Sequence, residues 1–376
     1  MVTRKQKKPT NPFVYKGYEG PNYFCDRKQE TENIVKALEN GRNLTLFSPR
    51  KIGKTGLIKH VFHHINENNK NAICIYLDIF ATQNLHDFVQ AMGIAIVEEA
   101  VEREKTLMAK VADAFKALRP VLSYDPMTGL PSISVDIEPS SEEHTLKGIF
   151  NHIESLNKDV YIAIDEFQQV ANYPEKGTEA LLRSHIQFSH AGFIFSGSRQ
   201  HLMAEMFSSP KRPFYQSTDV VALQPLPEAV YFDFSRRFFE ANNGTLSEEV
   251  FHNVYQRFRG HTWYVQLVMN RLYESTKRVE SKEQADQVIL GIIDTLSPQY
   301  EMMMSLLTAN QVNLLKAIAK EDKVEKPQSA AFIKRHNLSS ASSVKTALET
   351  LADKELVYHD ESGYIVYDRF LNLWLR

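Results

Sequence analysis

The sequence predicts an α/β protein whose parallel sheet is followed by an all-helical region and then by a small domain of three helices and a hairpin. In the first 223 residues, short apolar runs alternate with helical patterns, which is typical of parallel strands joined by crossover helices. Beyond Gln224-Pro-Leu-Pro227 the periodicity is helical to about Thr308. From Asn310 onward, three helical patterns precede a hairpin pattern, which is the order of a winged helix.

We expect each element at a defined place in the chain. The strands of the sheet are expected at 43–47, 72–78, 160–164, 192–196 and 219–223. Helices are expected at 26–38, 56–66 and from about 85 to 118, and a β-hairpin excursion is expected at 122–137 with Thr128-Gly129 at its turn. The winged helix is expected to consist of helices at 312–319, 330–336 and 344–354 and a hairpin at 356–368. The predicted domains are a basic flexible tail (1–20), an α/β core (21–223), a helical lid (224–304) and a winged helix (305–376).

The composition excludes several classes of protein but does not identify a partner. The charges of the 44 Lys and Arg residues nearly cancel those of the 46 Asp and Glu residues. The chain therefore lacks the strong positive field expected of a protein that binds nucleic acid over much of its surface. Cys25 and Cys74, the two cysteines, give neither a disulfide framework nor a metal-ligand spacing. No apolar run approaches the roughly 18 residues of a spanning helix, and none follows the basic N-terminus. We therefore expect a cytoplasmic protein without a membrane partner.

The segment Ser48-Pro-Arg-Lys-Ile-Gly-Lys-Thr55 lies between a predicted strand and a predicted helix. Such a loop directs successive backbone N–H groups at a phosphate, which also lies at the positive end of the helix dipole. Gly53 permits close approach, Lys54 reaches the β- and γ-phosphates, and the Thr55 hydroxyl ligates Mg²⁺. Ser48 stands where the first glycine of this motif is usual, a position where a small residue can still make the turn. The predicted nucleotide-binding residues of the loop are Ser48, Pro49, Arg50, Lys51, Ile52, Gly53, Lys54, Thr55 and Gly56.

Two adjacent carboxylates, Asp165 and Glu166, follow the apolar strand 160–164. Because the strand is buried, its end should present both groups beside the phosphate loop. Asp165 is predicted to hold Mg²⁺ and Glu166 to act as general base on the attacking water. The alternative is an acidic helix start with no chemical role.

Arg199 follows the strand 192–196 and is predicted to lie near the γ-phosphate, where a guanidinium stabilises developing charge. Its alternative interpretation is an exposed loop arginine. Trp263 and Tyr264 fall inside a helical segment, where aromatic residues are more often core than ligand contacts.

Together these segments resemble the archaeal-type ATPases of the STAND group, an AAA+-related lineage of signal-transducing P-loop NTPases. The resemblance covers about residues 20–376. It rests on the segments YFCDR (23–27), SPRKIGKT (48–55), IAIDEFQQV (162–170), FSGSR (195–199), GHTWYVQ (260–266) and YIVYDRFLNLWLR (364–376). It implies a parallel sheet of the additional-strand type, a helical lid, a winged helix, and ATP as the nucleotide.

The resemblance also implies roles for single residues. The segment that matches Phe24–Glu30 lies against the adenine in that family, which makes Phe24 and Arg27 predicted base contacts. The arginine that matches Arg199 is the family's nucleotide sensor. The family's lid motif reads G-x-P, whereas this chain has Thr262 in place of the proline.

We expect ATP with Mg²⁺ to order the winged helix and its hydrolysis to release it, through contacts of Lys54 and Arg199 with the γ-phosphate. Two outputs remain open: control of a protein partner or self-association, and binding of duplex DNA by the third helix of the winged helix. Residues 301–376 hold 10 Lys or Arg and 10 Asp or Glu, a neutral balance that weakens the DNA interpretation. A metabolic kinase is disfavoured because no separate substrate site is visible in the sequence.

Overall fold

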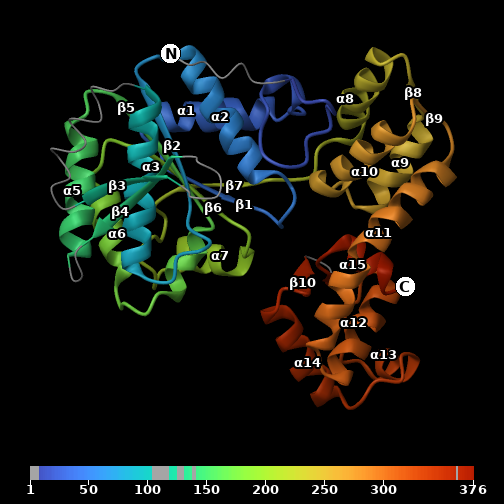
Figure 1. The fold of residues 1–376 in the computed structure, drawn as a ribbon. Coiled ribbons are helices and arrows are strands. Elements are labelled where there is room, and N and C mark those ends of the chain that lie inside the picture. Colours follow the sequence, from blue (N-terminus) through green and yellow to red (C-terminus); the bar gives the residue numbers. More distant parts are fainter. Residues whose placement is uncertain (1–7, 104–117, 125–130, 138–140, 361–362) are drawn as a thin grey trace. The chain divides into compact units, whose positions relative to one another are not determined.

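The structure, a computed structural model, describes residues 8–103, 118–124, 131–137, 141–360 and 363–376. Figure 1 shows the course of the chain and labels its elements. The chain divides into two compact units. Unit 1 comprises Met1–Tyr231 and His261–Trp263, and unit 2 comprises Phe232–Gly260 and Tyr264–Arg376.

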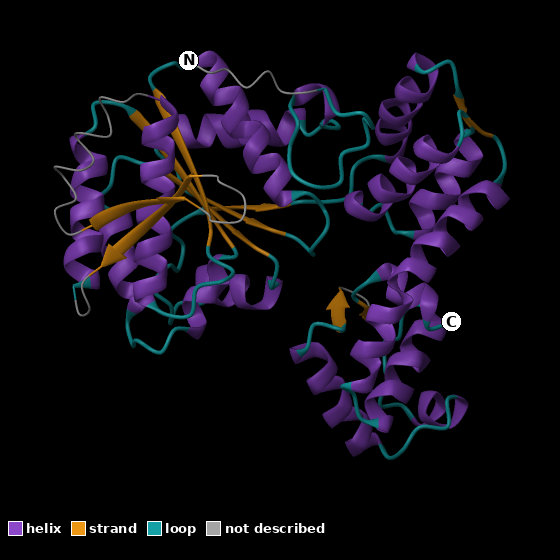
Figure 2. Ribbon diagram, in the orientation of Figure 1, coloured by secondary structure: helices purple, strands orange, loops and turns teal. Residues whose placement is uncertain are grey.

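Unit 1 is built on a five-stranded parallel sheet (Figure 2). Its strands are β1 (Leu44–Phe47), β2 (Ala72–Asp78), β5 (Asp159–Asp165), β6 (Gly192–Gly197) and β7 (Asp219–Ala222). Their order is β2-β5-β6-β1-β7, so β6 lies between β1 and β5. One additional strand thus separates the strand before the phosphate loop from the strand that ends in Asp165. The predicted α/β class and additional-strand arrangement are confirmed.

Helices cover both faces of this sheet. They are α1 (Lys28–Glu39), α2 (Lys54–Asn68), α3 (Leu85–Arg103), α5 (Glu142–Ser155), α6 (Thr178–Ile186) and α7 (Gln200–Ser208), with 3₁₀ turns η1 (Pro21–Tyr23) and η2 (Phe167–Asn172). Alternate side chains of a strand point to opposite faces. Accordingly, Ile162 and Phe193 share a core with α3, α5, α6 and α7, whereas Tyr161 and Ile194 share a core with α1 and α2. The result is a three-layer unit.

Two predicted segments of unit 1, the hairpin and the N-terminal segment, lie outside the main sheet. The hairpin forms an antiparallel pair, β3 (Leu118–Tyr124) with β4 (Pro131–Ile137), separate from the main sheet. Its predicted turn at Thr128-Gly129, and the part of the long helix predicted beyond Arg103, lie outside the described residues. In the segment predicted as a basic flexible tail, Phe13 is fully buried and the Tyr18 hydroxyl lies 2.8 Å from Nδ1 of His60. Part of that segment therefore packs on unit 1.

Unit 2 begins with the helices of the predicted lid. These are α8 (Glu228–Ala241), α9 (Glu248–Arg257), α10 (Thr262–Ser275) and α11 (Lys282–Ser305), with a short parallel pair of β8 (Thr245–Leu246) and β9 (Arg278–Val279). The first two residues of α10 belong to unit 1 and the rest of the helix to unit 2. Helix α10 is therefore a covalent connection between the two units.

The winged helix follows in the predicted order. Its elements are α12 (Ala309–Glu321), α13 (Ala330–Arg335), α14 (Ala341–Asp353), the antiparallel pair β10 (Val357–Asp360) and β11 (Gly363–Val366), and α15 (Arg369–Trp374). Thr308, Ser329 and Ser340 cap the three helices by accepting backbone N–H groups, as such residues do at helix starts. The predicted winged helix is confirmed.

Within unit 2, one carboxylate joins the lid to the winged helix. Asp322, just after α12, accepts hydrogen bonds at 2.6 Å from Arg259 of the lid and from Arg369 and Arg376 of the winged helix. The ring of Phe258 packs beside that of Phe370 with centroids 4.9 Å apart. Lid and winged helix therefore share a core and an ion-pair cluster. Among the described helices, none combines the length and apolar character needed to cross a membrane.

Candidate nucleotide-binding site

The loop from Ser48 to Gly53 leads from β1 into α2. Gly53 has φ +106°, which lies in the left-handed region that glycine adopts at least cost. Lys51 has φ +68° and adopts the same region although it carries a side chain. Ser48 is not among the described residues with positive φ, so the first position of this loop does not require glycine. Its hydroxyl instead donates to the Pro49 carbonyl at 3.1 Å.

Lys54 lies inside this loop, with only 7% of its surface exposed. Its Nζ donates to the Ser48 carbonyl at 2.9 Å. Burial lowers the pKa of Lys54 to about 8, although the charges of Asp165 and Glu166 oppose that shift. The buried Lys54 ammonium group therefore lies among backbone groups at the start of α2, where a phosphate is favoured.

Asp165, at the end of β5, is buried next to Thr55. Its Oδ2 accepts hydrogen bonds from the Thr55 hydroxyl at 2.8 Å and from the Tyr76 hydroxyl at 2.7 Å. Burial and the neighbouring Asp165 raise the pKa of Tyr76, which therefore stays protonated and donates. Sequence reasoning missed Tyr76, although its place two residues before Asp78 puts it on a defined face of β2.

Glu166 has φ +57°, an unusual conformation for this residue type. Its carboxylate accepts hydrogen bonds from Ser198 Oγ at 2.8 Å and from the Gln168 amide. Ser198 in turn accepts from Arg50 Nε at 3.1 Å. A continuous polar network therefore runs from the phosphate loop through the end of β6 to Glu166.

The sequence pointed to Arg199 at the end of β6, and Ser198 was missed. Arg199 is exposed and forms the N-cap of α7, where its carbonyl accepts from the Met203 N–H at 3.0 Å. The residue that contacts Glu166 is its neighbour Ser198, because alternate residues of an extended segment face opposite ways. The sensor role of Arg199 stays a prediction.

The two predicted base contacts differ in their surroundings. Phe24 stacks on His60 of α2 with ring centroids 4.3 Å apart, and a Cβ at Gly56 would lie 3.4 Å from the Phe24 ring. Arg27 is buried, and its guanidinium donates to Glu30 and to the Gln224 carbonyl at 2.7 Å each. The Arg27 side chain therefore ties the start of α1 to the segment that leads into the lid, and base contact by either residue stays a prediction.

Thr262 and Trp263, from the start of α10, lie against the phosphate loop. The Thr262 hydroxyl donates to the Ile52 carbonyl at 3.0 Å, and the backbone N–H of Trp263 donates to the Lys51 carbonyl at 3.0 Å. Lys51 Nζ also lies 4.3 Å from the centre of the Trp263 ring. Trp263 thus contacts the loop rather than a core, and Thr262 makes a bond that a proline at its position could not.

Among the described residues, no group of three or more His, Cys, Asp or Glu side chains could hold a metal ion. The oxygens suited to a Mg²⁺ ion are those of Thr55 and Asp165, a hydroxyl and a carboxylate already in contact.

Residues 24–268 match the protein family described as an ATPase domain predominantly from Archaea, and residues 298–376 match a family described as a probable winged helix domain. An uncharacterized ATP-binding protein of Methanocaldococcus jannaschii is 21% identical over 321 residues, which cover 78% of this chain and 84% of that protein.

Two solved structures share the fold at low identity. The Walker-type ATPase of Pyrococcus abyssi has a TM-score of 0.68 at 15% identity, with 97% of this chain and 99% of that chain covered. The ORC1 protein of Aeropyrum pernix in complex with DNA has a TM-score of 0.56 at 13% identity, with 97% and 96% covered. Because the family match spans more than half of the sequence, this chain belongs to the family of ATPase domains found predominantly in Archaea.

Proposed function

We propose that this chain is a STAND-like cytoplasmic switch that binds ATP with Mg²⁺, hydrolyses it slowly, and uses the nucleotide state to rearrange its lid (224–304) and winged helix (305–376). The rearrangement controls a protein partner. The choice of ATP is supported by the family and by the relative that is named as ATP-binding.

The residues of the site suit these roles. Lys54 and the backbone of the loop would hold the phosphates. Thr55 and Asp165 fit Mg²⁺, because they offer hard oxygen ligands side by side. When bound, the ion would neutralise charge on the phosphates. Glu166 would orient and deprotonate the attacking water, with Ser198 holding its carboxylate in place.

The observation that supports the switch proposal is the set of contacts made by three consecutive residues of α10. Thr262 and Trp263 bond the backbone of the phosphate loop in unit 1. The next residue, Tyr264, is buried in unit 2, where its hydroxyl accepts the Arg369 N–H of α15 at 3.1 Å. A change in the loop backbone on phosphate binding would therefore act within one residue on a side chain that holds the winged helix.

The test is ATP binding and hydrolysis by the full chain and by two variants. Lys54→Ala should lose ATP binding, and Glu166→Gln should keep ATP bound while losing turnover. Glu39→Gln, an exposed carboxylate of α1, is the matched control and should behave as wild type. Wild-type protein that binds no nucleotide would refute the proposal.

Movement of the winged helix needs its own readout. Hydrogen exchange of α15 should differ between the ATP-trapped Glu166→Gln protein and the ADP-bound wild type. Identical hydrogen exchange in the two states would contradict the proposed switch, although the protein could still be an ATPase.

The second candidate function is DNA binding by the winged helix. It is favoured by the serine-rich start of α14, where Ser340 caps the helix and Ser342 and Ser343 lie in its first turn. Against it, Arg335 is paired with Glu321 at 2.7 Å, which lowers the charge available to phosphates. Addition of duplex DNA at near-physiological salt decides between the two outputs, since salt-dependent binding that stimulates hydrolysis would favour DNA.

A further inference from the structure

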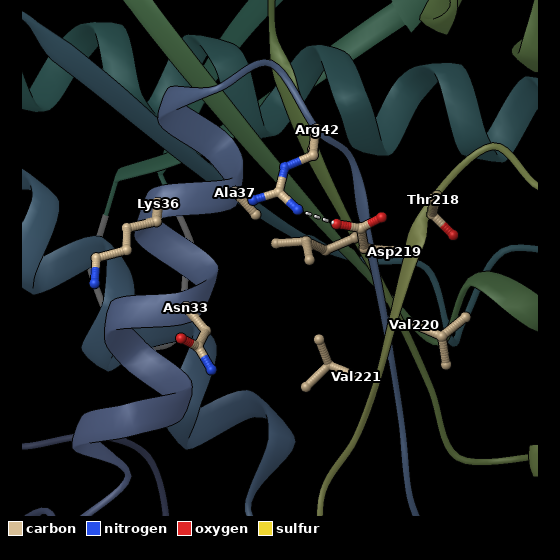
Figure 3. Close-up of a pocket in the computed structure, with 9 residues that line it drawn as sticks. Asn33, Lys36, Ala37, Arg42, Thr218, Asp219, Val220 and Val221 are labelled. Atoms are coloured by element: carbon tan, nitrogen blue, oxygen red, sulfur yellow. Dashed lines mark hydrogen bonds and ion pairs between the residues drawn. The ribbon is translucent and has the colours of Figure 1, made fainter.

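A groove runs between α1 and β7 at the edge of the main sheet (Figure 3). Its volume is about 610 Å³. Ala37, Leu44 and Val221 give it apolar walls, and Lys36, Arg42 and Asp219 lie around it. In Figure 3, Arg42 reaches across one end of the groove to Asp219, with 2.6 Å between the two charged groups.

The backbone of β7 is the second feature of this groove. β7 pairs with β1 on one side, and within the described part of the chain no strand lies on its other side. The N–H groups of Asp219 and Leu223 donate toward β1. In a parallel strand, alternate residues direct both their N–H and C=O to the same side. Val220 and Ala222 therefore direct theirs outward, and residue Val220 is 53% exposed.

These features fit a single extended chain. A strand added beside β7 would lie about 4.8 Å from it and would direct alternate side chains into the groove. A second copy of this protein fits less well, because four-residue β7 strands paired with each other would bury far less than the roughly 1,200 Å² of a stable interface.

The charges around the groove favour an acidic occupant. Lys36 and Arg42 are both more than half exposed. Their ion pairs, with Glu32 and with Asp219, are surface pairs of the kind that contribute little and are easily exchanged. The charged residues that line the groove are two cations and one carboxylate, Asp219, so an acidic side chain placed beside Lys36 and Arg42 would meet a net positive charge.

We propose that β7 and the groove beside α1 bind an extended segment of a partner protein, which pairs with Val220 and Ala222, places an apolar side chain between Ala37 and Val221, and presents an acidic residue to Lys36 and Arg42. This inference names the docking place of the protein partner, and to that extent it rests on the proposed function. Binding at the groove is nevertheless measurable without nucleotide.

The probe is a phage-displayed library of random twelve-residue peptides, selected on the full chain without nucleotide. The selected peptides should share alternating apolar residues and an acidic flank, and should protect the Val220 and Ala222 amides from hydrogen exchange. Val220→Pro removes an outward N–H that β1 does not use, so peptide affinity should fall about tenfold, the size of one net hydrogen bond. Val220→Thr, which keeps the N–H, should bind as wild type.

A second pair of variants tests the charge and does not depend on the backbone. Lys36→Glu should weaken binding of the acidic peptides, whereas Lys147→Glu, at an exposed position of α5 outside the groove, should not. Each variant should still bind ATP, which separates failure of the groove from failure of the nucleotide site.

Three results would overturn the inference. They are a selection that yields no peptides, peptides that bind Val220→Pro and Lys36→Glu as tightly as wild type, and a dimer in sedimentation that Val220→Pro dissociates. The last result would assign the β7 edge to a second copy of the chain.

Discussion

Replacement of Asp322 by Asn should destabilise unit 2 strongly. Asn removes the charge that three arginines share but keeps the shape of the side chain. It also tolerates the backbone at this position, where φ is +63°, better than Ala does. The effect should therefore report on the ion-pair cluster rather than on backbone strain.

The magnitude follows mainly from Arg369, whose side chain is 4% exposed. Among the residues that the structure describes, none accepts a hydrogen bond from its buried Nε and Nη1. Loss of the Asp322 charge would therefore leave the buried Arg369 guanidinium without a carboxylate partner. Breaking a buried pair in this way costs about 3–5 kcal/mol. Asp322 itself is 37% exposed, and solvent screening places the expected loss near the lower end, about 3 kcal/mol. Arg259 and Arg376 are more exposed and should add little.

The assay is urea unfolding followed by tryptophan fluorescence. In a Trp263→Phe background, Trp374 is the remaining tryptophan and reports on unit 2, where its ring packs against Tyr300. Asp353→Asn, an exposed carboxylate at the end of α14, is the matched control. A loss below about 1 kcal/mol, the scale of a surface pair, would refute the reasoning.

The pH dependence of the same experiment has a defined sign. Burial alone would raise the pKa of Asp322, but the hydrogen bonds and charges of Arg259 and Arg369 outweigh it and hold this pKa below its ordinary value. A depressed carboxyl pKa contributes stability above the unfolded pKa of about 3.9, and that stability is lost as the pH falls toward the folded pKa. The difference between wild type and Asp322→Asn should be constant near neutral pH and shrink below about pH 4.

Three further predictions concern the nucleotide site. Because burial lowers the pKa of Lys54 to about 8, its ammonium is lost as the pH rises through that value, and ATP affinity measured with a fluorescent analogue should fall between pH 7 and 9. Ser198→Ala removes the hydrogen bond that holds the Glu166 carboxylate, so kcat should fall about tenfold while ATP affinity changes little. Thr262→Val loses the hydrogen bond to Ile52 and should reduce the ATP-dependent change in α15 hydrogen exchange, while ATP binding persists; an unchanged response would disprove this coupling.

The fold was predictable where the sequence shows regular patterns. The strand 72–78 was predicted at its observed bounds, because its apolar run ends at a polar residue. The neighbours of each strand were not predictable in the same way, since the placement of β6 between β1 and β5 depends on long-range pairing. Phe13 was also missed, because its burial depends on contacts outside its basic local sequence.

For the candidate site, sequence reasoning identified motif residues better than the groups around them. Thr55 and Asp165, the two predicted Mg²⁺ ligands, lie in hydrogen-bond contact, because the motif fixes the position of one and a strand end fixes the other. Ser198 and Tyr76 are ordinary polar residues whose roles depend on the register of adjacent strands. Thr262 was visible as a departure from the family motif, yet its hydrogen bond to the phosphate loop required coordinates.

The Asp322 cluster also bears on how the proposed switch would work. Arg259 lies just before the turn into α10, and Arg369 is the residue whose N–H the Tyr264 hydroxyl accepts. Both arginines bond the same carboxylate, so displacement of α10 would act on lid and winged helix together rather than on the lid alone. If so, Asp322→Asn should weaken the ATP-dependent change in α15 exchange without altering ATP affinity, because the variant uncouples the two parts without touching the nucleotide site. A full response in folded Asp322→Asn would instead mean that the aromatic contact of Phe258 with Phe370 is sufficient for the coupling.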